Sequence, residues 1–593
     1  MYSFAGEFLH QQVILMSEAE KHHYLSSTMN EPESIRTDLG SLSDLTIFAI
    51  IAFVACLIYA KSLAYQYTYF DDIFLLVVNK EFLSNLANLP RLFSTDVFIA
   101  VANPEVFYRP LMNILFMLEM QLSDNSTAIF HLTNILLHIG CSLLVFVVLK
   151  QLRVSKGIAA AAAILFCAHP LNTSAVVWIP GRNDTLLTLL VLASFSMLIR
   201  ALDAKHIWPL VGHMVFFFLA LLTKEVAIAL PILAASYVVL VRKERLSRNI
   251  IAITTTSYIL LIAAWFALRS LVPRTLELHQ SSAELAIDWL KNSPAFILYF
   301  GKAILPFNLS VFPNLTDQSL IYGVVAVLLF ALLYFLGRPA SNRLLLWGLG
   351  WYFFFLAPSL LSGTIFFEHR NYCSFVGLLI AIVELPMIQK INFARPIHVF
   401  GLVALFALLG VLAMFHSEHF RNRYSFATSA FTESPSVDES YSALAGFYLD
   451  DREYDDAERV LQAGIARNPV MRTAHRMLGD VYAKRRKYAL AANEYETSIR
   501  LEPLQLYTYI NYGKMCLQVG KLDDAVRLWK RSVLLNPEFL PGYEYLTNFY
   551  LYTRNDPDSA MIYARQIQQR GVTVLPELLH DIQNHPLYGK RKQ

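Results

Sequence analysis

The chain has 593 residues, of which 55% are hydrophobic and 16% are charged, and its mean hydropathy is +0.43. This composition is typical of a polytopic membrane protein and excludes a single soluble domain. The net charge of +3 is too small to indicate a nucleic-acid partner, and the five widely spaced cysteines form no CxxC pair, so neither a zinc site nor a disulfide framework is predicted.

The amino-terminal part predicts an all-α membrane domain. Residues 1–44 are polar, lack the apolar run of a signal peptide, and are expected to form a cytoplasmic tail. Leu45–Ala64 is the first of about 11 apolar runs of membrane-spanning length. The others lie at about 129–149, 157–179, 184–200, 207–223, 226–241, 250–268, 319–336, 344–362, 373–389 and 397–415. This domain therefore covers residues 45–415.

Two shorter segments are ambiguous, namely Leu111–Leu122 and Phe296–Phe312, which Pro306 interrupts. We expect surface-lying or re-entrant helices there. If neither crosses, the five basic loops fall on one side, which the positive-inside rule makes cytoplasmic. These loops contain Lys150, Arg153 and Lys156; Arg200 and Lys205; Arg242, Lys243, Arg245 and Arg248; Arg338 and Arg343; and Lys390 and Arg395. The loop at 65–128 and everything after Met414 are then non-cytoplasmic.

The carboxyl-terminal part has a soluble composition and repeats every 34 residues. Small residues (Ala445, Gly479, Gly513) and prolines (Pro469, Pro503, Pro537) recur in phase. This is the tetratricopeptide pattern, in which small residues separate two packed helices and a proline ends the second. After a linker at 416–437, we expect units at 438–471, 472–505 and 506–539, a divergent cap at 540–573, and a tail at 574–593. Such an array presents a groove to polypeptides.

Two adjacent carboxylates, Asp71 and Asp72, follow the first span. They are either solvated loop acids or functional groups, because acids at the mouth of a span are costly unless solvated, paired or used. In the functional interpretation, one of them deprotonates a hydroxyl nucleophile. If the site uses a divalent cation, both are its expected ligands. Arg109, in the same loop, either reaches toward lipid headgroups or binds a phosphate.

Polar residues also interrupt the later apolar runs. His131, Asn134 and His138 share one helical face, and we favour hydrogen bonds between helices over direct catalysis for them. His169-Pro170 and the Gly181–Asp184 segment indicate backbone that lines a cleft. Lys224-Glu225 is either a self-neutralising pair or part of a site, and Glu368-His369-Arg370 could supply a cation to a leaving phosphate. No nucleotide-binding or hydrolase motif occurs in a usable context, and a sugar donor carried on a lipid phosphate would need none.

The order of these motifs resembles the transmembrane-and-tetratricopeptide O-mannosyltransferase (TMTC) family and its bacterial relatives, from about residue 60 to 560. The resemblance rests on the aromatic-Asp-Asp loop at 69–72 and on segments 108–111, 130–138, 168–176, 181–184, 224–225 and 368–372. It implies a GT-C-like membrane fold that uses polyprenyl-phosphate sugars on the non-cytoplasmic face. The chain departs from the family pattern at Thr173-Ser174, at Glu368–Asn371 and in its short repeat array.

The resulting hypothesis is a transferase that moves mannose or another hexose from a polyprenyl phosphate to a hydroxyl, expected to be a Ser or Thr of a protein held by the repeats. Asp71 or Asp72 is its base. The resemblance places further residues at the donor site: Tyr108, Arg109, His131, His169, Arg182, Asp184, Lys224, Glu225, Glu368, His369 and Arg370. The short array favours a bacterial inner membrane over the endoplasmic reticulum. The alternatives are a non-catalytic membrane scaffold and a lipid-linked glycan polymerase, ligase or flippase.

Overall fold

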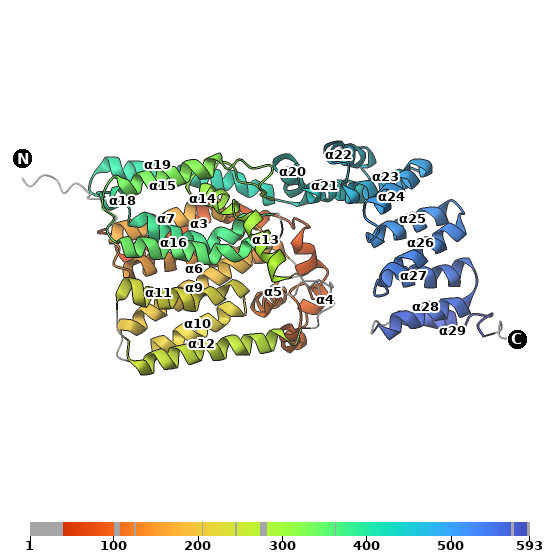
Figure 1. Cartoon of the computed structure of the whole chain (residues 1–593), viewed down its shortest axis with the longest axis horizontal. Coiled ribbons are helices and arrows are strands. Elements are labelled where there is room, and N and C mark those ends of the chain that lie inside the picture. The colour runs from red at the N-terminus through yellow and green to blue at the C-terminus, as the bar shows by residue number, and fades with distance from the viewer. Residues whose placement is uncertain are drawn as a thin grey trace, which may run out of the picture.

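The computed structural model describes residues 40–99, 107–123, 126–203, 206–243, 246–272, 281–361, 363, 365–570 and 574–589. Most of the expected tail 1–44 lies outside these ranges. Within them the chain forms helices and no strand, so the predicted all-α class is confirmed. Figure 1 shows a bundle of long, roughly parallel helices followed by an array of short hairpins.

The first half of the bundle combines long helices with shorter and broken ones. These are α3 (Asp44–Tyr59), α6 (Thr127–Gln151), α7 (Lys156–Ala168), α8 (Thr173–Val177), α9 (Arg182–Asp203), α10 (Trp208–Leu221), α11 (Leu230–Ser236) and α12 (Arg248–Arg269). Between α3 and α6 lie the short helices α4 (Lys80–Leu83) and α5 (Pro110–Leu122). Helices α7 and α8 are bent by 50° where His169 and Pro170 interrupt the expected run at 157–179.

The second half of the bundle contains α13 (Ser282–Asn292), α14 (Ala295–Ile304), α15 (Ile321–Phe335), α16 (Asn342–Leu356), α17 (Tyr372–Val383), α18 (Pro386–Gln389) and α19 (Pro396–Ser417). By length and composition, seven helical segments of the described residues can cross a membrane, or eight if the bent pair counts as one. The remaining expected spans coincide with the shorter helices α10, α15 and α17. The ambiguous segments form the short helices α5 and α14.

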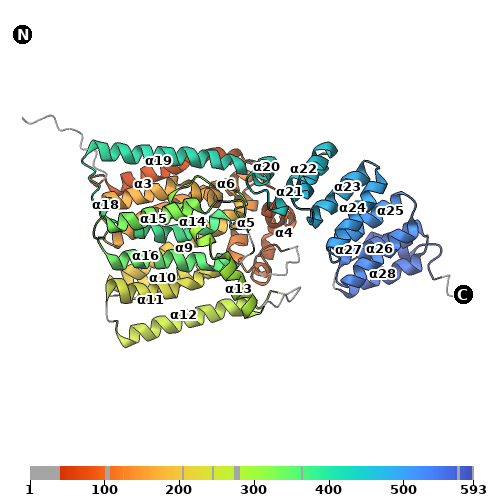
Figure 2. The ribbon, with the colours of Figure 1, turned by 45° about the horizontal axis from the view of Figure 1, so that its top comes forward.

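The loops between these helices separate into two ends. At one end Asp44 forms ion pairs with Lys150 (2.5 Å) and Lys156 (3.0 Å). The loop after α15 joins the same end, since the Ala340 N–H donates to the Glu384 carbonyl (3.1 Å). Figures 1 and 2 show α18 at this end, whereas α4, α5 and α20 lie at the other end, next to the repeats. The Asp71 loop and the array therefore share one end, opposite these basic loops.

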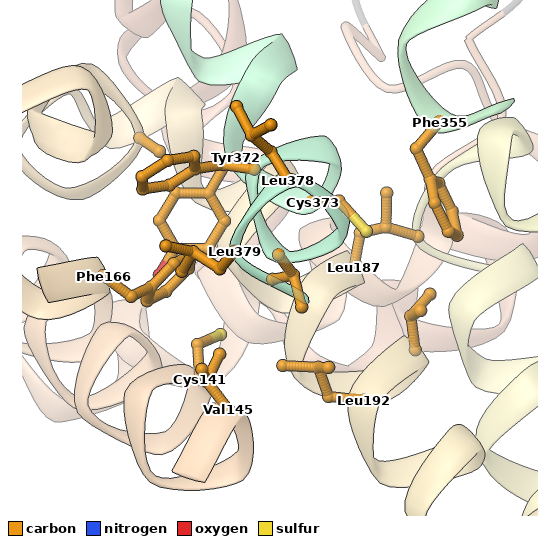
Figure 3. Close-up of a cluster of buried hydrophobic side chains, with 14 of the residues drawn as sticks. Cys141, Val145, Phe166, Leu187, Leu192, Phe355, Tyr372, Cys373, Leu378 and Leu379 are labelled. Carbon is orange, nitrogen blue, oxygen red and sulfur yellow. The ribbon is translucent and has the colours of Figure 1, made fainter. Parts of the chain in front are cut away.

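The core of the bundle is formed by α6, α7, α9, α16 and α17. Figure 3 shows its side chains, among them Cys141, Phe166, Leu187, Phe355 and Cys373. Helices α16 and α17 approach closely because each has a glycine at the crossing. A Cβ atom on Gly348 would lie 2.6 Å from the Gly377 carbonyl oxygen, so no larger residue fits there.

The array consists of helix hairpins. Its helices are α21 (Asp438–Asp450), α22 (Tyr454–Arg467), α23 (Arg472–Lys484), α24 (Tyr488–Leu501), α25 (Leu506–Gln518), α26 (Leu522–Leu535), α27 (Leu540–Asn548), η11 (Phe549–Thr553), α28 (Pro557–Gln569) and α29 (Pro576–Gln583). Each expected unit contains one hairpin. The glycine rows have the predicted packing role, since a Cβ on Gly479 would lie 2.7 Å from the Tyr495 ring. Helix α29 lies in the expected tail.

The expected linker at 416–437 is itself ordered. It contains α20 (Arg423–Glu433), and its following turn is tied to the bundle. The Ser434 hydroxyl donates to the Phe312 carbonyl (2.6 Å), and the Ser436 N–H donates to Asp317 Oδ2 (2.8 Å). Helix α20 also contributes Phe426, which packs on Phe70. The array is thus joined to the loop that carries Asp71.

Candidate active site

A cavity of about 490 Å³ gathers ionisable side chains from segments that are far apart in sequence. Its walls come from the Asp71 loop, the Phe107–Met112 segment, the start of α9, the Lys224–Val226 turn and the Phe367–Cys373 segment. Leu187, Phe355 and Cys373 of the core close its apolar side. Seven of the residues singled out in the sequence line it: Asp71, Arg109, Asp184, Lys224, Glu225, His369 and Arg370.

The backbone before Asp71 determines how the two acids diverge. Tyr69 adopts a φ of +58°, a conformation that non-glycine residues rarely adopt. The guanidinium of Arg423 lies 5.7 Å from its ring, and Phe70 packs against Phe312 at 5.0 Å between centroids. A helical turn then begins at Asp71 and continues as a π-helical segment, η2 (Ile73–Val77). Because adjacent residues in a helical turn point about 100° apart, the two carboxylates point in different directions, and only Asp71 lines the cavity.

Asp72 is the buried partner, with 1% of its surface exposed. Its Oδ2 accepts hydrogen bonds from the Thr68 N–H (2.6 Å) and the Thr68 hydroxyl (3.0 Å). The Trp178 indole N–H in turn donates to that hydroxyl (3.1 Å). Asp72 therefore closes the turn that presents Asp71. Burial raises the pKa of Asp72 to about 6, against the lowering effect of the Thr68 hydrogen bonds.

Asp71 is half-buried and lines the cavity. Burial and then the neighbouring Asp72 charge raise its pKa to about 7, although Arg109 and Arg370 act in the opposite direction. A carboxyl group with such a pKa is ionised to a useful extent near neutral pH and still has a strong affinity for a proton. It therefore suits general-base chemistry.

Three cationic side chains, Arg109, Lys224 and Arg370, line the same cavity as Asp71. Lys224 Nζ lies 2.9 Å from both carboxylate oxygens of Asp184. Arg109 Nη2 lies 3.6 Å from Glu225 Oε1, and the Leu111 N–H donates to the Leu222 carbonyl (3.2 Å), which holds the two segments together. Two of the cations are therefore held in place by carboxylates.

Arg370 is the third cation, and its orientation is set by backbone. Its Nη1 donates to the Ile365 carbonyl (3.1 Å), and its guanidinium lies 5.1 Å from the Phe367 ring centroid. The adjacent His369 stacks on Phe367 at 5.3 Å and lies 5.3 Å from Trp178. Burial, followed by the charges of Lys224, Arg370 and Arg109, holds the pKa of His369 well below its ordinary value. The histidine is neutral at pH 7, so the cation of this segment is Arg370.

Arg182 does not line the cavity and is fully buried behind it. It forms an ion pair with Glu119, its Nε donates to Asn134 Oδ1 (2.9 Å), and its guanidinium lies 4.4 Å from the Phe116 ring centroid. Asn134 also donates to the Val176 carbonyl (3.1 Å). These contacts tie the start of α9 to α5 and α6, so Arg182 positions Asp184 rather than facing the cavity.

Glu368 is likewise buried outside the cavity. Its carboxylate accepts hydrogen bonds from Lys302 Nζ (2.6 Å) and the Ser310 N–H (2.8 Å) and lies 2.9 Å from His416 Nε2. Burial raises the pKa of Glu368, but Lys302 and His416 outweigh it and lower the pKa to about 2. This network fixes the short helix η9 (Glu368–Asn371), which presents His369 and Arg370.

The other three candidates are also packed away from the cavity: Tyr108, His131 and His169. The His131 ring faces the Tyr65 ring at 6.2 Å, and the His169 ring packs on Phe375 at 4.7 Å. On the same face as His131, the His138 side chain forms the interhelical bonds that the sequence favoured, to the Tyr372 hydroxyl (2.6 Å) and the Cys167 carbonyl (3.0 Å).

Sequence reasoning missed several contributors: Trp178 and Phe367 in the cavity wall, and Glu119, Lys302 and His416 as buried partners. Two of them could have been found from a pattern in the sequence. Glu119 is the single charge in Leu111–Leu122, and Lys302 is the single charge in Phe296–Phe312. A lone charge in an apolar run requires a buried partner. The identity of that partner depends on the fold.

A shared metal site does not fit the two aspartates. Asp71 faces the cavity, whereas Asp72 turns toward Thr68 and Trp178. In the part of the chain that the structure describes, no group of three or more His, Cys, Asp or Glu residues is placed to hold a metal ion.

Fold and cavity together define a class: an all-helical integral membrane protein with a tetratricopeptide array beside a polar cavity. Residues 448–505 match the family model described as "Tetratricopeptide repeat". The chain is 31% identical over 180 residues to "Protein O-mannosyl-transferase TMTC1" of Mus musculus, covering 29% of this chain and 19% of that protein. It is 33% identical over 159 residues to the Homo sapiens protein of that name, covering 26% and 18%.

A third relative is "Protein O-mannosyl-transferase F38B6.6" of Caenorhabditis elegans, with 27% identity over 221 residues, covering 36% of this chain and 32% of that protein. The matched segments thus span between 18% and 32% of these relatives. A solved structure, "Crystal structure of MamA", is also similar, with 18% identity, a TM-score of 0.22 and coverage of 24% of this chain and 84% of that one. The predicted resemblance to the TMTC family is confirmed by the named relatives.

Proposed function

We propose that this protein is a GT-C-type membrane glycosyltransferase that transfers a hexose from a polyprenyl phosphate to a hydroxyl group of a polypeptide. One observation carries the proposal: a single cavity combines a carboxyl group whose pKa is about 7 with three cationic side chains. The names of the TMTC relatives support a sugar transferred to protein, with mannose as the first candidate.

In the proposed reaction Asp71 accepts the proton of the acceptor hydroxyl. At the same time the oxygen of that hydroxyl attacks the anomeric carbon of the sugar. The new C–O bond forms as the bond between that carbon and the phosphate oxygen breaks, and the bonding electron pair leaves with the polyprenyl phosphate. The single displacement inverts the anomeric centre. Base catalysis of this kind contributes about 10²–10⁴-fold to a rate.

Arg109, Lys224 and Arg370 are the proposed phosphate ligands. Guanidinium groups bind phosphate oxygens through paired N–H donors, and a lysine adds a point charge. The charge on the phosphate grows as the bond to the sugar breaks, so these cations stabilise the transition state more than the bound donor. Their pairing with Asp184 and Glu225 holds Lys224 and Arg109 in position before the donor arrives.

The proposed side of the membrane for the cavity follows from the charge of the loops at the two ends of the bundle. The basic loops lie at the end opposite the cavity, so the positive-inside rule makes the cavity and the array non-cytoplasmic. A donor whose prenyl chain lies in the bilayer can reach a cavity at the bundle end.

The test is a transfer assay in membranes. Membranes containing the protein are given labelled polyprenyl-phosphate mannose, and label is counted in the protein and glycolipid fractions. We expect label in protein, a loss of about 10²-fold or more in Asp71→Asn, and no loss in Glu81→Gln, which removes an exposed acid from the same loop. Equal transfer by Asp71→Asn at equal expression would contradict the proposal. Label only in glycolipid would indicate a polymerase or ligase instead.

A further inference from the structure

A second cavity, outside the one already described, lies in the array. It has a volume of about 1020 Å³ and is formed between one face of α26 and the segment from Tyr550 to Asp556. Besides Leu528, the α26 residues that line it are spaced so that they share one helical face: Asp523, Val526, Arg527, Lys530, Arg531 and Leu534. We call this cavity the α26 cleft. Its size is that of a typical ligand site.

The α26 cleft has an excess of positive charge. It contains four cations, Arg527, Lys530, Arg531 and Arg554, and two acids. Arg554 forms an ion pair with the acid Asp523, and Arg527 lies 2.7 Å from Asp524, outside the cleft. Within the described ranges, no carboxylate lies within ion-pair distance of Lys530 or Arg531. A positive field therefore remains in the cleft and would attract an anionic ligand.

The cleft also offers apolar contact. Leu534 is 69% exposed, so its side chain is available for apolar contact with a ligand in the cleft. Tyr550 stacks on Tyr563 at 5.6 Å, and Lys530 Nζ lies 6.0 Å from the Tyr550 ring centroid. The ligand that matches this surface has carboxylates that can pair with Lys530 and Arg531 and an apolar group that can contact Leu534.

We infer that the α26 cleft docks an acidic segment of the acceptor polypeptide, with an apolar side chain of that segment against Leu534. This inference rests on the proposed function only in naming the bound polypeptide as the acceptor. A polypeptide is favoured over an anionic bilayer because the cleft combines charges with an apolar contact in a concave site. In addition, both views show helices α25–α28 standing clear of the bundle (Figures 1 and 2).

The test measures binding to the full-length protein in detergent, using a fluorescent peptide of alternating glutamate and leucine and a second peptide with glutamine in place of glutamate. We expect the acidic peptide to bind, the neutral one to bind weakly, and added salt to weaken the acidic complex. The charge reversal Lys530→Glu with Arg531→Glu should weaken binding at least about tenfold. Both side chains are exposed, so the variant should fold.

The matched control is Lys484→Glu with Arg565→Glu, which makes the same change of charge at exposed positions outside the cleft. It should bind the acidic peptide as the unmodified protein does. Equal binding by the cleft variant, or equal loss in the control, overturns the inference. So does binding of anionic phospholipid vesicles, but not peptide, through Lys530 and Arg531. Asp71→Asn should bind the peptide normally, so a failed transfer assay would count against the proposed function alone.

Discussion

The pH dependence of sugar transfer tests the different roles of Asp71 and Asp72. In the proposed mechanism Asp71 must be ionised to accept a proton, and burial together with the Asp72 charge raises its pKa to about 7. The rate must therefore increase as the pH rises through about 7. Replacing Asp72 with Asn removes the neighbouring charge and keeps an acceptor oxygen for the Thr68 hydrogen bonds.

The size of the effect follows from the ionised fraction of Asp71. At one pH unit below its pKa only about a tenth of the carboxyl groups are ionised, so kcat/KM should fall about tenfold between pH of about 8 and pH of about 6. A carboxyl group with the ordinary pKa of 3.8 would give a flat profile over that range. In Asp72→Asn the midpoint should move to lower pH, because a raising influence has been removed.

The assay compares initial rates of transfer across pH for the unmodified protein, Asp72→Asn and Asp71→Asn, at equal amounts in detergent. The profile of kcat/KM reports the ionisations of the free enzyme. A flat profile for the unmodified protein would refute the reasoning. So would full activity in Asp71→Asn combined with none in Asp72→Asn, since the roles of the two acids would then be reversed.

Three further changes test the packing of the protein, two near the cavity by thermal unfolding in detergent and one in the array by proteolysis. Arg182→Gln leaves Glu119 buried without its partner and should cost about 3–5 kcal/mol; an unchanged midpoint would remove Arg182 from its structural role. The pKa of Glu368 is lowered from 4.5 to about 2, so its ionised carboxylate stabilises the folded protein fully above pH 4.5. This stabilisation should disappear as the pH falls to about 2. The variant Glu368→Gln should lack this pH dependence of the unfolding temperature. Gly513→Ala forces a Cβ into the Trp529 ring and should lower the stability of the array by about 1–3 kcal/mol. We expect a protease to cleave the array of this variant faster than that of the unmodified protein, with no change in the bundle.

The parts of this fold that depend on local pattern could be predicted from sequence. The 34-residue period gives the helix hairpins of the array, and apolar runs give the long helices of the bundle. Seven of the candidate site residues meet in one cavity because polar groups at the ends of helices on the same side converge there. The helix break at His169-Pro170 falls where these residues interrupt the apolar pattern of the sequence.

The division of roles between neighbouring residues could not be predicted. Asp71 and Asp72 are adjacent, and only the turn that begins at Tyr69 decides which of them faces the cavity. Arg182 and Asp184 lie in one motif, yet the first pairs with Glu119 and the second with Lys224. Side chains one or two positions apart on a helix point in different directions, and their partners come from distant segments.

The central claim is that a donor phosphate occupies the cavity beside Asp71. The most direct measurement is a cryo-electron microscopy map of the protein with a bound polyprenyl phosphate. We predict phosphate density within hydrogen-bond distance of Arg109, Lys224 or Arg370, with the prenyl chain extending into the bilayer. Phosphate density at the opposite end of the bundle, or a cavity that stays empty of it while the lipid is bound elsewhere, would contradict the proposed site.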